Sequence, residues 1–143
     1  MNLEKMDRMP AVAAVMTPFP HSVDIDAPLE RAREMMIRHG FHHLPVMGGG
    51  KVVGLVSEYR LRRAERSGRG RRVRDICTLD PWIVATTAPL DAVLAKMARD
   101  QIQTALVVKG GRLAGIFTLT DACRHFAAVL RQKFPGSGGD EAA

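Results

Sequence analysis

Two related stretches decide the fold of this chain: HLPVMGGGKVVGLVSEYR at residues 43–60 and TALVVKGGRLAGIFTLTD at residues 104–121. The correspondence extends outward without a gap, so that residues 16–61 align with residues 77–122 at a fixed offset of 61. The two copies share 12 identical residues over these 46 positions, whereas unrelated sequences of ordinary composition would share roughly three. The chain therefore contains an internal duplication.

A helix is predicted near the start of each copy. In the second copy, apolar residues recur at i, i+3, i+4 and i+7, the spacing of one buried helix face; they are Leu90, Val93, Leu94 and Met97. We expect Pro28 and Pro89 in the first turns of the two helices, with Asp26 and Thr87 as their caps. Gly40 is expected to end the first helix in the left-handed conformation.

A β-hairpin follows each helix, and a second helix follows each hairpin. The predicted strands are His43–Met47 with Lys51–Val56, and Thr104–Val108 with Arg112–Phe117. The second helices are expected to open at Ser57 and Thr118. With a short strand before the first helix, each copy has the order β-α-β-β-α, which predicts an α+β fold. Each copy is too small to bury its apolar face alone, so the two copies should pack together.

The repeat also predicts how the chain is divided. We expect an N-terminal segment with a short helix at residues 1–11, a first repeat at 12–66, an arginine-rich linker at 67–72, a second repeat at 73–131 and a disordered tail at 132–143. The tail is predicted because its end is rich in glycine and has no apolar residue larger than alanine.

The composition indicates a globular protein. The chain has 143 residues, of which 46% are hydrophobic, enough for one compact domain or two fused half-domains. The longest apolar run near its start, residues 11–16, is far shorter than the roughly 18 residues of a membrane span. We therefore expect a cytoplasmic protein that does not bind a membrane. Cys77 and Cys123 lack the spacing of a zinc site or a disulfide framework, so we expect both to be reduced.

Four short stretches in this order resemble the cystathionine-β-synthase (CBS) domain pair, also called the Bateman module. They are VMTP at 15–18, GFHHLPV at 40–46, GLVS at 54–57 and GIFTLTD at 115–121. The resemblance covers about residues 12–130. It implies two CBS repeats paired around a pseudo-twofold axis, with a cleft that binds AMP, ADP, ATP, NAD or S-adenosylmethionine. It also implies that such pairs form homodimers.

Thr118 and Asp121 are the principal candidates for ligand binding. Thr118 lies just after a strand, at the predicted start of a helix, where unpaired N–H groups and the helix dipole favour a phosphate. The carboxylate of Asp121 can accept from both hydroxyls of a ribose. The alternative is a capping box, in which these two side chains only satisfy each other's backbone donors. The two roles are compatible.

The base of such a ligand needs an apolar slot, and the second copy offers candidates for it. Side chains placed to line the slot are Ile83, Val84, Ile102, Ala105 and Leu106, with backbone groups near Gln103 and Thr104 facing the edge of the base. Ordinary core packing is the alternative reading of these residues. Thr17, His43 and Thr78 complete the predicted set of ligand contacts.

The first copy differs at the decisive position. Ser57 retains the hydroxyl of Thr118, but Arg60 stands where the second copy has Asp121. A guanidinium group has five donors and no acceptor, so it cannot accept from ribose hydroxyls. Either the first cleft is empty, or Arg60 binds a phosphate or a neighbouring carboxylate. We expect one competent adenosine site, built on the second copy.

A basic stretch suggests a different function. Eight arginines lie within fifteen residues: Arg60, Arg62, Arg63, Arg66, Arg69, Arg71, Arg72 and Arg74. Clustered arginine can contact a nucleic-acid backbone, so nucleic-acid binding is one alternative. The sequence lacks the motifs of DNA-binding folds and has few aromatic residues, which disfavours it. A structural dimerisation module with empty clefts is a further alternative.

The sequence does not predict catalysis or metal binding. A dinucleotide-binding glycine fingerprint, a nucleophile elbow and paired carboxylates at a cleft are all absent from it. His39, His42 and His43 are close in sequence, but neighbours on a strand point to opposite faces and are poorly placed to share an ion. We therefore predict a stand-alone signal-transduction module that binds AMP, ADP or ATP and regulates an unidentified protein.

Overall fold

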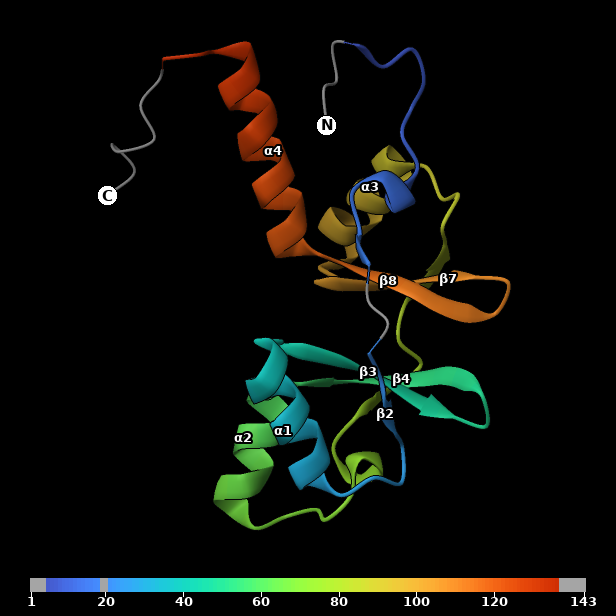
Figure 1. The fold of residues 1–143 in the computed structure, drawn as a ribbon, viewed down its shortest axis with the longest axis vertical. Helices are drawn as coiled ribbons and strands as arrows, with labels where there is room; N and C mark the ends of the chain where they lie inside the picture. The colour runs from blue at the N-terminus through green and yellow to red at the C-terminus, as the bar shows by residue number, and fades with distance from the viewer. Residues whose placement is uncertain (1–4, 19–20, 137–143) are drawn as a thin grey trace.

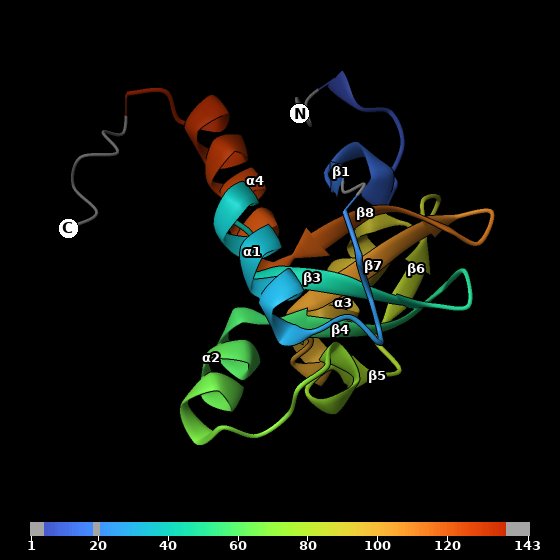
Figure 2. The ribbon, with the colours of Figure 1, turned by 60° about the horizontal axis from the view of Figure 1, so that its bottom comes forward.

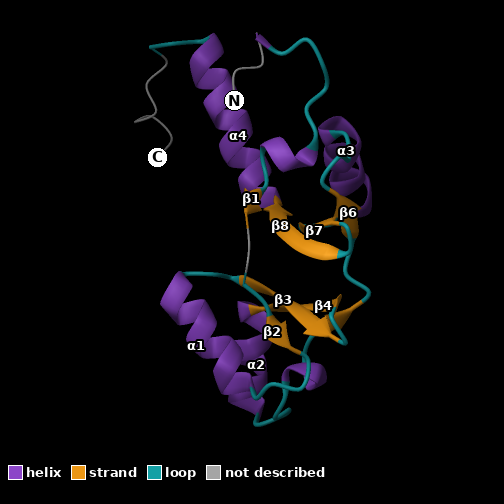
Figure 3. Ribbon diagram, turned by 45° about the vertical axis from the view of Figure 1, so that its right-hand side comes forward, coloured by secondary structure: helices purple, strands orange, loops and turns teal. Residues whose placement is uncertain are grey.

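Two four-stranded β-sheets lie face to face at the centre of the molecule, and helices cover the outer face of each sheet (Figures 1 and 3). The structure is a computed structural model that describes residues 5–18 and 21–136. One half of the molecule carries the first two α-helices and the other half carries the last two, so the layers run helix, sheet, sheet, helix.

The elements follow one another in the order that the duplication predicts. In chain order they are η2 (Val12–Ala14), β1 (Thr17–Pro18), β2 (Val23–Asp24), α1 (Leu29–His39), β3 (His43–Gly48), β4 (Lys51–Ser57), α2 (Glu58–Ser67), η3 (Val73–Asp75), β5 (Thr78–Leu79), β6 (Ile83–Ala85), α3 (Leu90–Asp100), β7 (Thr104–Lys109), β8 (Arg112–Thr118) and α4 (Leu119–Lys133). The α+β class and the β-α-β-β-α order of each copy are confirmed. Each copy also begins with a short 3-10 helix and a two-residue strand, which the sequence did not predict.

The two halves exchange their first strands. β1 pairs antiparallel with β8 of the second copy, with Thr17 opposite Ile116, and β5 pairs antiparallel with β4 of the first copy, with Thr78 opposite Leu55 (Figure 2). The sheets therefore have the orders β1-β8-β7-β6 and β2-β3-β4-β5. The start of each repeat thus belongs to the sheet of the other repeat.

The exchange carries apolar side chains with it. Val12 and Val15 lie in the core beneath α3, in the half formed mainly by the second copy. Val73 lies in the core of the other half, where its N–H donates to the carbonyl of Ala27 at 2.9 Å. Because buried valines anchor both segments, neither half can be separated from the other without exposing its own core.

The inner faces of the sheets form a shared apolar layer. Leu106 and Ile116 of the second copy lie in the same buried cluster as Leu44 and Val56 of the first. The neighbour of Leu106 on β7, Ala105, belongs instead to the cluster beneath α3. This alternation follows from the strand geometry, in which successive side chains point to opposite faces.

The predicted caps of the first helices are wrong. The N-cap residues of α1 and α3 are Pro28 and Pro89, both with extended backbone and without a side-chain hydrogen bond. Each helix therefore starts two residues later than caps at Asp26 and Thr87 would imply, because proline is the N-cap residue instead of lying in the first turn. Asp26 accepts from the guanidinium of Arg74 instead. The left-handed end of α1 at Gly40 is confirmed, with φ of 69°.

The ends of the chain differ in part from the prediction. α4 continues to Lys133, two residues into the segment predicted as a disordered tail, and basic residues in its last turn suit the helix dipole. The chain is not helical between Met6 and Pro10, which contradicts this part of the short helix predicted within 1–11. Residues 1–4 and 137–143 lie outside the described residues. In the described part of the chain, no helix has both the length and the apolar character needed to cross a membrane.

Two glycines allow the strand exchange. A Cβ atom at Gly115 would lie 2.7 Å from the carbonyl oxygen of Thr17, and one at Gly54 would lie 2.8 Å from the carbonyl oxygen of Thr78. Neither glycine has a positive φ, so close backbone approach alone excludes a side chain at these positions.

We expect Gly115→Ala to lower the free energy of unfolding by about 2 to 3 kcal/mol, because the added methyl group overpacks against backbone. Gly111→Ala is the matched control, since its Cβ would meet open space and only its positive φ is unfavourable, at about 1 kcal/mol. Urea denaturation of both variants measures the difference. Equal stability of the two would contradict the close approach of β1 to β8.

One polar side chain in the core lacks a partner. Thr104 is 8% exposed, and its hydroxyl forms no hydrogen bond within the described residues. A buried hydroxyl in this state is destabilising, because it has lost its hydrogen bonds to water without replacing them.

We expect Thr104→Val to raise the free energy of unfolding by about 1 kcal/mol, because the substitution removes the unpaired hydroxyl and keeps the shape. Thr104→Ser is the control, since it keeps the hydroxyl, loses a buried methyl group and should be less stable than the wild type. Thermal melting of the three proteins orders their stabilities. A valine variant that melts below the wild type would show that the hydroxyl has a partner.

Candidate ligand-binding cleft

The candidate site lies at the start of α4, where Thr118 and Asp121 form a reciprocal pair. The Asp121 Oδ2 atom accepts from the backbone N–H of Thr118 at 2.9 Å and from its hydroxyl at 3.0 Å, while Thr118 Oγ1 accepts from the N–H of Asp121 at 3.1 Å. This is the capping box that the sequence offered as an alternative. The cap holds the carboxylate in place, and Asp121 is only 6% exposed.

The second carboxylate oxygen of Asp121 faces two other side chains. Arg124, one turn further along α4, donates from Nη1 to Oδ1 at 3.0 Å, and Thr17 donates from its hydroxyl to the same atom at 3.4 Å. Thr17 reaches this position because β1 is exchanged into the second sheet. Both carboxylate oxygens therefore have partners from the protein.

The helix start offers fewer free donors than the sequence implied. The N–H of Leu119 donates to the carbonyl of Gln103 at 2.9 Å, and that of Asp121 is held by the cap. Two of the first three N–H groups of α4 are thus already bonded. A phosphate near this helix would depend more on side-chain donors than on the backbone.

A cleft of about 340 Å³ adjoins Asp121 and is lined by both repeats. Its lining residues are Thr17, Gly40, Phe41, His42, His43, Ile116, Thr118, Thr120, Asp121 and Arg124. Four predicted contacts thus come together here: Thr17, His43, Thr118 and Asp121. Sequence reasoning missed Phe41 and Arg124, although the i,i+3 spacing of Arg124 from Asp121 on a helix was a usable signal.

Histidines from the first repeat give the cleft its opposite wall. His43 is half-buried, and burial lowers its pKa, with a further decrease from the charge of His42. His43 is therefore neutral at neutral pH and can both donate and accept. His42 contacts Glu58 at 2.6 Å through Nδ1, and this hydrogen bond lowers the pKa of Glu58. The pair ties the loop after α1 to the start of α2.

The predicted slot for the base is not part of this cleft. Ala105 is fully buried in the core, and Val84 packs against the same core, so core packing accounts for both. Ile83 is 40% exposed on β6. Gln103 lies just before β7, and its carbonyl accepts from the N–H of Leu119. None of these residues lines the cleft beside Asp121. The cleft beside Asp121 is lined instead by Ile116 of the second repeat and by residues 40–43 of the first.

The equivalent position in the first copy is built differently. Ser57 caps α2 by accepting from the N–H of Arg60 at 3.2 Å, as Thr118 caps α4. The guanidinium of Arg60 donates to the carbonyl of Ile76 at 3.4 Å and lines a separate cleft beside α2. Thr78 is exposed on β5. The acidic acceptor of the second copy is thus replaced by a cation that faces elsewhere.

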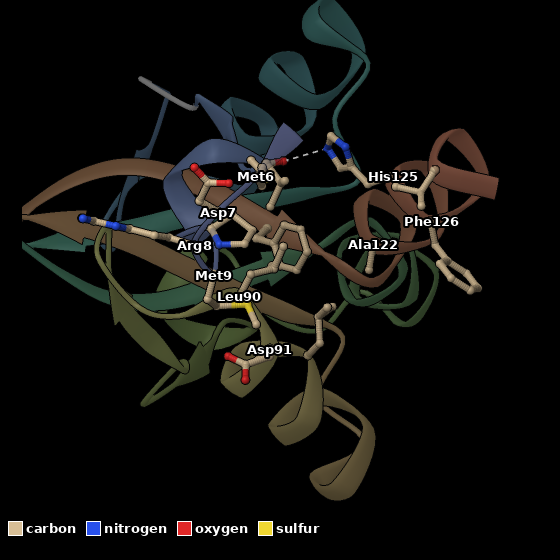
Figure 4. Close-up of a pocket in the computed structure, with 14 residues that line it drawn as sticks. Met6, Asp7, Arg8, Met9, Leu90, Asp91, Ala122, His125 and Phe126 are labelled. Atoms are coloured by element: carbon tan, nitrogen blue, oxygen red, sulfur yellow. Dashed lines mark hydrogen bonds between the residues drawn. The ribbon is translucent and has the colours of Figure 1, made fainter. Parts of the chain in front are cut away.

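A larger cavity lies away from Asp121. Figure 4 shows this cavity of about 500 Å³, which is bounded by the segment Met6–Pro10 and by side chains of α3 and α4 that include Leu90 and Phe126. One edge is held by a hydrogen bond of 3.0 Å between the His125 ring and the carbonyl of Val15. The lining is mostly apolar, which suits a protein surface better than a phosphorylated ligand.

Metal-ligating side chains do not converge in the described part of the chain: among residues 5–18 and 21–136, no three His, Cys, Asp or Glu side chains are placed to hold an ion.

The family model of the CBS domain matches residues 12–67 and 73–128. Among curated proteins, the zinc metalloprotease MJ0392 of Methanocaldococcus jannaschii is 32% identical over 116 residues, which cover 80% of this chain and 32% of that protein. The chain spans less than a third of the length of the curated relatives it matches.

Solved structures show the same fold. The structure of CBSX2 in complex with AMP has a TM-score of 0.71 at 25% identity and covers 85% of this chain and 99% of that chain. The CBS domain of the bacterial CNNM/CorC family Mg²⁺ transporter in complex with ATP has a TM-score of 0.71 at 25% identity, with coverage of 82% and 87%. Together with the duplicated fold and the family match to both copies, these similarities show that the chain belongs to the CBS-domain family as a tandem CBS pair.

Proposed function

We propose that this CBS pair is a non-catalytic regulatory module that binds AMP, ADP or ATP in the cleft beside Asp121. The observation that carries the proposal is the cleft itself, which both repeats line and which contains a buried carboxylate, a hydroxyl and a guanidinium group. The AMP and ATP complexes of CBSX2 and the Mg²⁺ transporter domain support an adenine nucleotide.

A ribose can bind Asp121 without breaking the helix cap. Oδ2 stays with Thr118, while a ribose hydroxyl replaces Arg124 at Oδ1. The Arg124 side chain is 67% exposed, whereas that of Asp121 is 8% exposed, so the buried Oδ1 atom needs a hydrogen-bond donor and a ribose hydroxyl can take over that role. The exchange therefore keeps Oδ1 hydrogen-bonded and releases a guanidinium group for the phosphate.

The other walls of the cleft suit the remaining parts of the nucleotide. Ile116 offers an apolar surface to the base, and the neutral ring of His43 can hydrogen-bond to its edge. Arg124 favours a ligand with phosphate over the positively charged S-adenosylmethionine, because a guanidinium attracts the first and repels the second. We therefore place AMP, ADP and ATP ahead of the other adenosine compounds.

Regulation follows from the position of the cleft. The walls of the cleft come from both repeats, so the affinity for the nucleotide depends on how the two halves are positioned. If the halves have two arrangements, a bound nucleotide shifts the equilibrium toward the arrangement that it binds more tightly. Coupling of this kind is typically about 1 to 3 kcal/mol. The regulated partner is a separate protein or another part of a longer chain.

We also propose that the protein forms a homodimer through the face between α3 and α4. Leu94 and Phe126, which are 38% and 64% exposed, line the apolar cavity of Figure 4, and Leu130, which is 43% exposed, lies four residues after Phe126 on α4. Apolar side chains clustered in this way mark an interaction surface. A second copy of the chain fits the dimerisation that is usual in the family.

We expect AMP at 100 times its Kd to raise the melting temperature by about 9 °C. Ligand binding at that ratio adds about 2.7 kcal/mol to the free energy of unfolding, and the unfolding entropy of a chain of this length converts that gain to the temperature shift. Asp121→Asn should remove most of this shift, because an amide accepts less well from a ribose. Differential scanning fluorimetry with AMP, ADP, ATP, NAD and S-adenosylmethionine measures the effect.

Two further variants keep the nucleotide test decisive. Arg124→Gln leaves the cap intact and should weaken AMP binding, because the guanidinium group that would contact the phosphate is removed. Asp100→Asn changes a carboxylate that pairs with Lys96 at the far end of α3 and should bind AMP as the wild type does. A flat melting temperature across the whole ligand panel would end the proposal of an adenosine site.

We expect Phe126→Glu to convert the dimer to a monomer, because a carboxylate would be buried in an apolar interface. Ile37→Glu is the control, since Ile37 is 75% exposed on α1, outside the cavity between α3 and α4. Sedimentation velocity gives the masses. A wild-type monomer, or a dimer lost with Ile37→Glu alone, would refute the α3–α4 interface.

A further inference from the structure

A second polar cleft lies beside α2, on the half of the molecule built mainly from the first repeat. It has a volume of about 520 Å³ and lies between α2 and the segment that leads into η3. Its lining residues are Tyr59, Arg60, Arg63, Ala64, Ser67, Arg69, Gly70, Asp75 and Ile76. It shares no residue with the cleft beside Asp121.

Guanidinium groups dominate this cleft. Arg60, Arg63 and Arg69 line it, and none of them has a carboxylate partner among the described residues. In the arginine-rich stretch, the ion pairs present involve Arg62 and Arg74, which lie outside the lining. The cleft therefore carries positive charge that the protein does not neutralise.

The one acidic group of the cleft is already engaged. Asp75 Oδ2 accepts from the backbone N–H of Arg71 at 2.9 Å and of Arg72 at 3.0 Å. These two hydrogen bonds lower the pKa of Asp75, so the carboxylate is ionised and serves to hold the loop. Its presence still leaves an excess of positive charge from the three lining arginines.

The loop that carries Arg69 is held in one conformation. Gly68 ends α2 with φ of 65°, and the N–H of Arg69 donates to the carbonyl of Ala64 at 3.2 Å. Gly70 has φ of 82°, and a Cβ there would lie 3.2 Å from the Asp75 Cβ atom. The segment predicted as an arginine-rich linker is thus anchored, which fixes the backbone from which Arg69 projects.

We propose that this cleft binds a chain of two or more linked phosphates, supplied by inorganic polyphosphate or by the phosphate tail of a nucleotide. Guanidinium groups bind phosphate oxygens in pairs of hydrogen bonds, and three of them around one concavity suit several adjacent charges. The positive charges converge on a single cleft, and one exposed aromatic ring, that of Tyr59, lies beside it. Single-stranded nucleic acid favours an extended basic groove with several stacking rings instead.

The experiment measures tripolyphosphate binding by isothermal titration calorimetry at 150 mM NaCl. The wild type should bind tripolyphosphate, and the double variant Arg63→Gln, Arg69→Gln should bind it at least tenfold more weakly. Both side chains are exposed and form no ion pair with the described residues, so the substitutions leave the fold intact. Arg131→Gln, on the last turn of α4, is the matched control and should bind as the wild type does.

Two arms separate this site from the adenosine cleft and identify the source of the phosphate. The double variant should keep its response to AMP, and Asp121→Asn should keep its affinity for tripolyphosphate. In the Asp121→Asn variant, equal affinities for ATP and tripolyphosphate assign the site to the phosphate chain alone, whereas much tighter ATP binding assigns it to a nucleotide.

Three results would overturn the proposal. In the first, the wild type does not bind tripolyphosphate. In the second, the Arg63 and Arg69 substitutions leave the affinity for tripolyphosphate unchanged. In the third, that affinity falls with Arg124→Gln instead. Tighter binding of a twelve-nucleotide single-stranded RNA than of tripolyphosphate, lost in the same double variant, would assign the cleft to nucleic acid.

Discussion

The close approach of a carbonyl oxygen to a glycine, once in each half, is the contact on which the structure depends. The carbonyl oxygens of Thr17 and Thr78 lie only 2.7 and 2.8 Å from the positions that a Cβ atom of Gly115 and Gly54 would occupy. This allows the first strand of each repeat to pair with the sheet of the other. The exchanged segments bring buried valines with them, so the two halves share their cores and form one cooperative unit.

The same exchange builds the cleft beside Asp121. β1 places the Thr17 hydroxyl 3.4 Å from Asp121, and the loop after α1 supplies the opposite wall with Phe41 and His43. Neither repeat alone contains this set of groups. A ligand that fills the cleft therefore contacts both halves, which is the physical requirement for coupling its binding to their arrangement.

The two repeats have diverged in charge while keeping one backbone. Ser57 and Thr118 cap equivalent helices in the same way, but the third residue beyond the cap is Arg60 in one copy and Asp121 in the other. The carboxylate stays buried inside its cap, whereas the guanidinium reaches outward to the Ile76 carbonyl. One cleft thus presents a hydrogen-bond acceptor and the other presents donors, which is the chemical difference behind the two proposed ligands.

The sequence by itself determined the local structure. The duplication, the helical apolar spacing and residues such as Gly40 act over a few positions, and they predicted the element order and the helix that opens at Thr118. The tertiary structure decided which residues meet. The base slot predicted around Ala105 is core, because the strand alternation that buries this side chain depends on which sheet faces which helix. Phe41 joined the cleft only because the first repeat packs against the second, since contacts between residues some eighty positions apart are set by packing and not by local pattern.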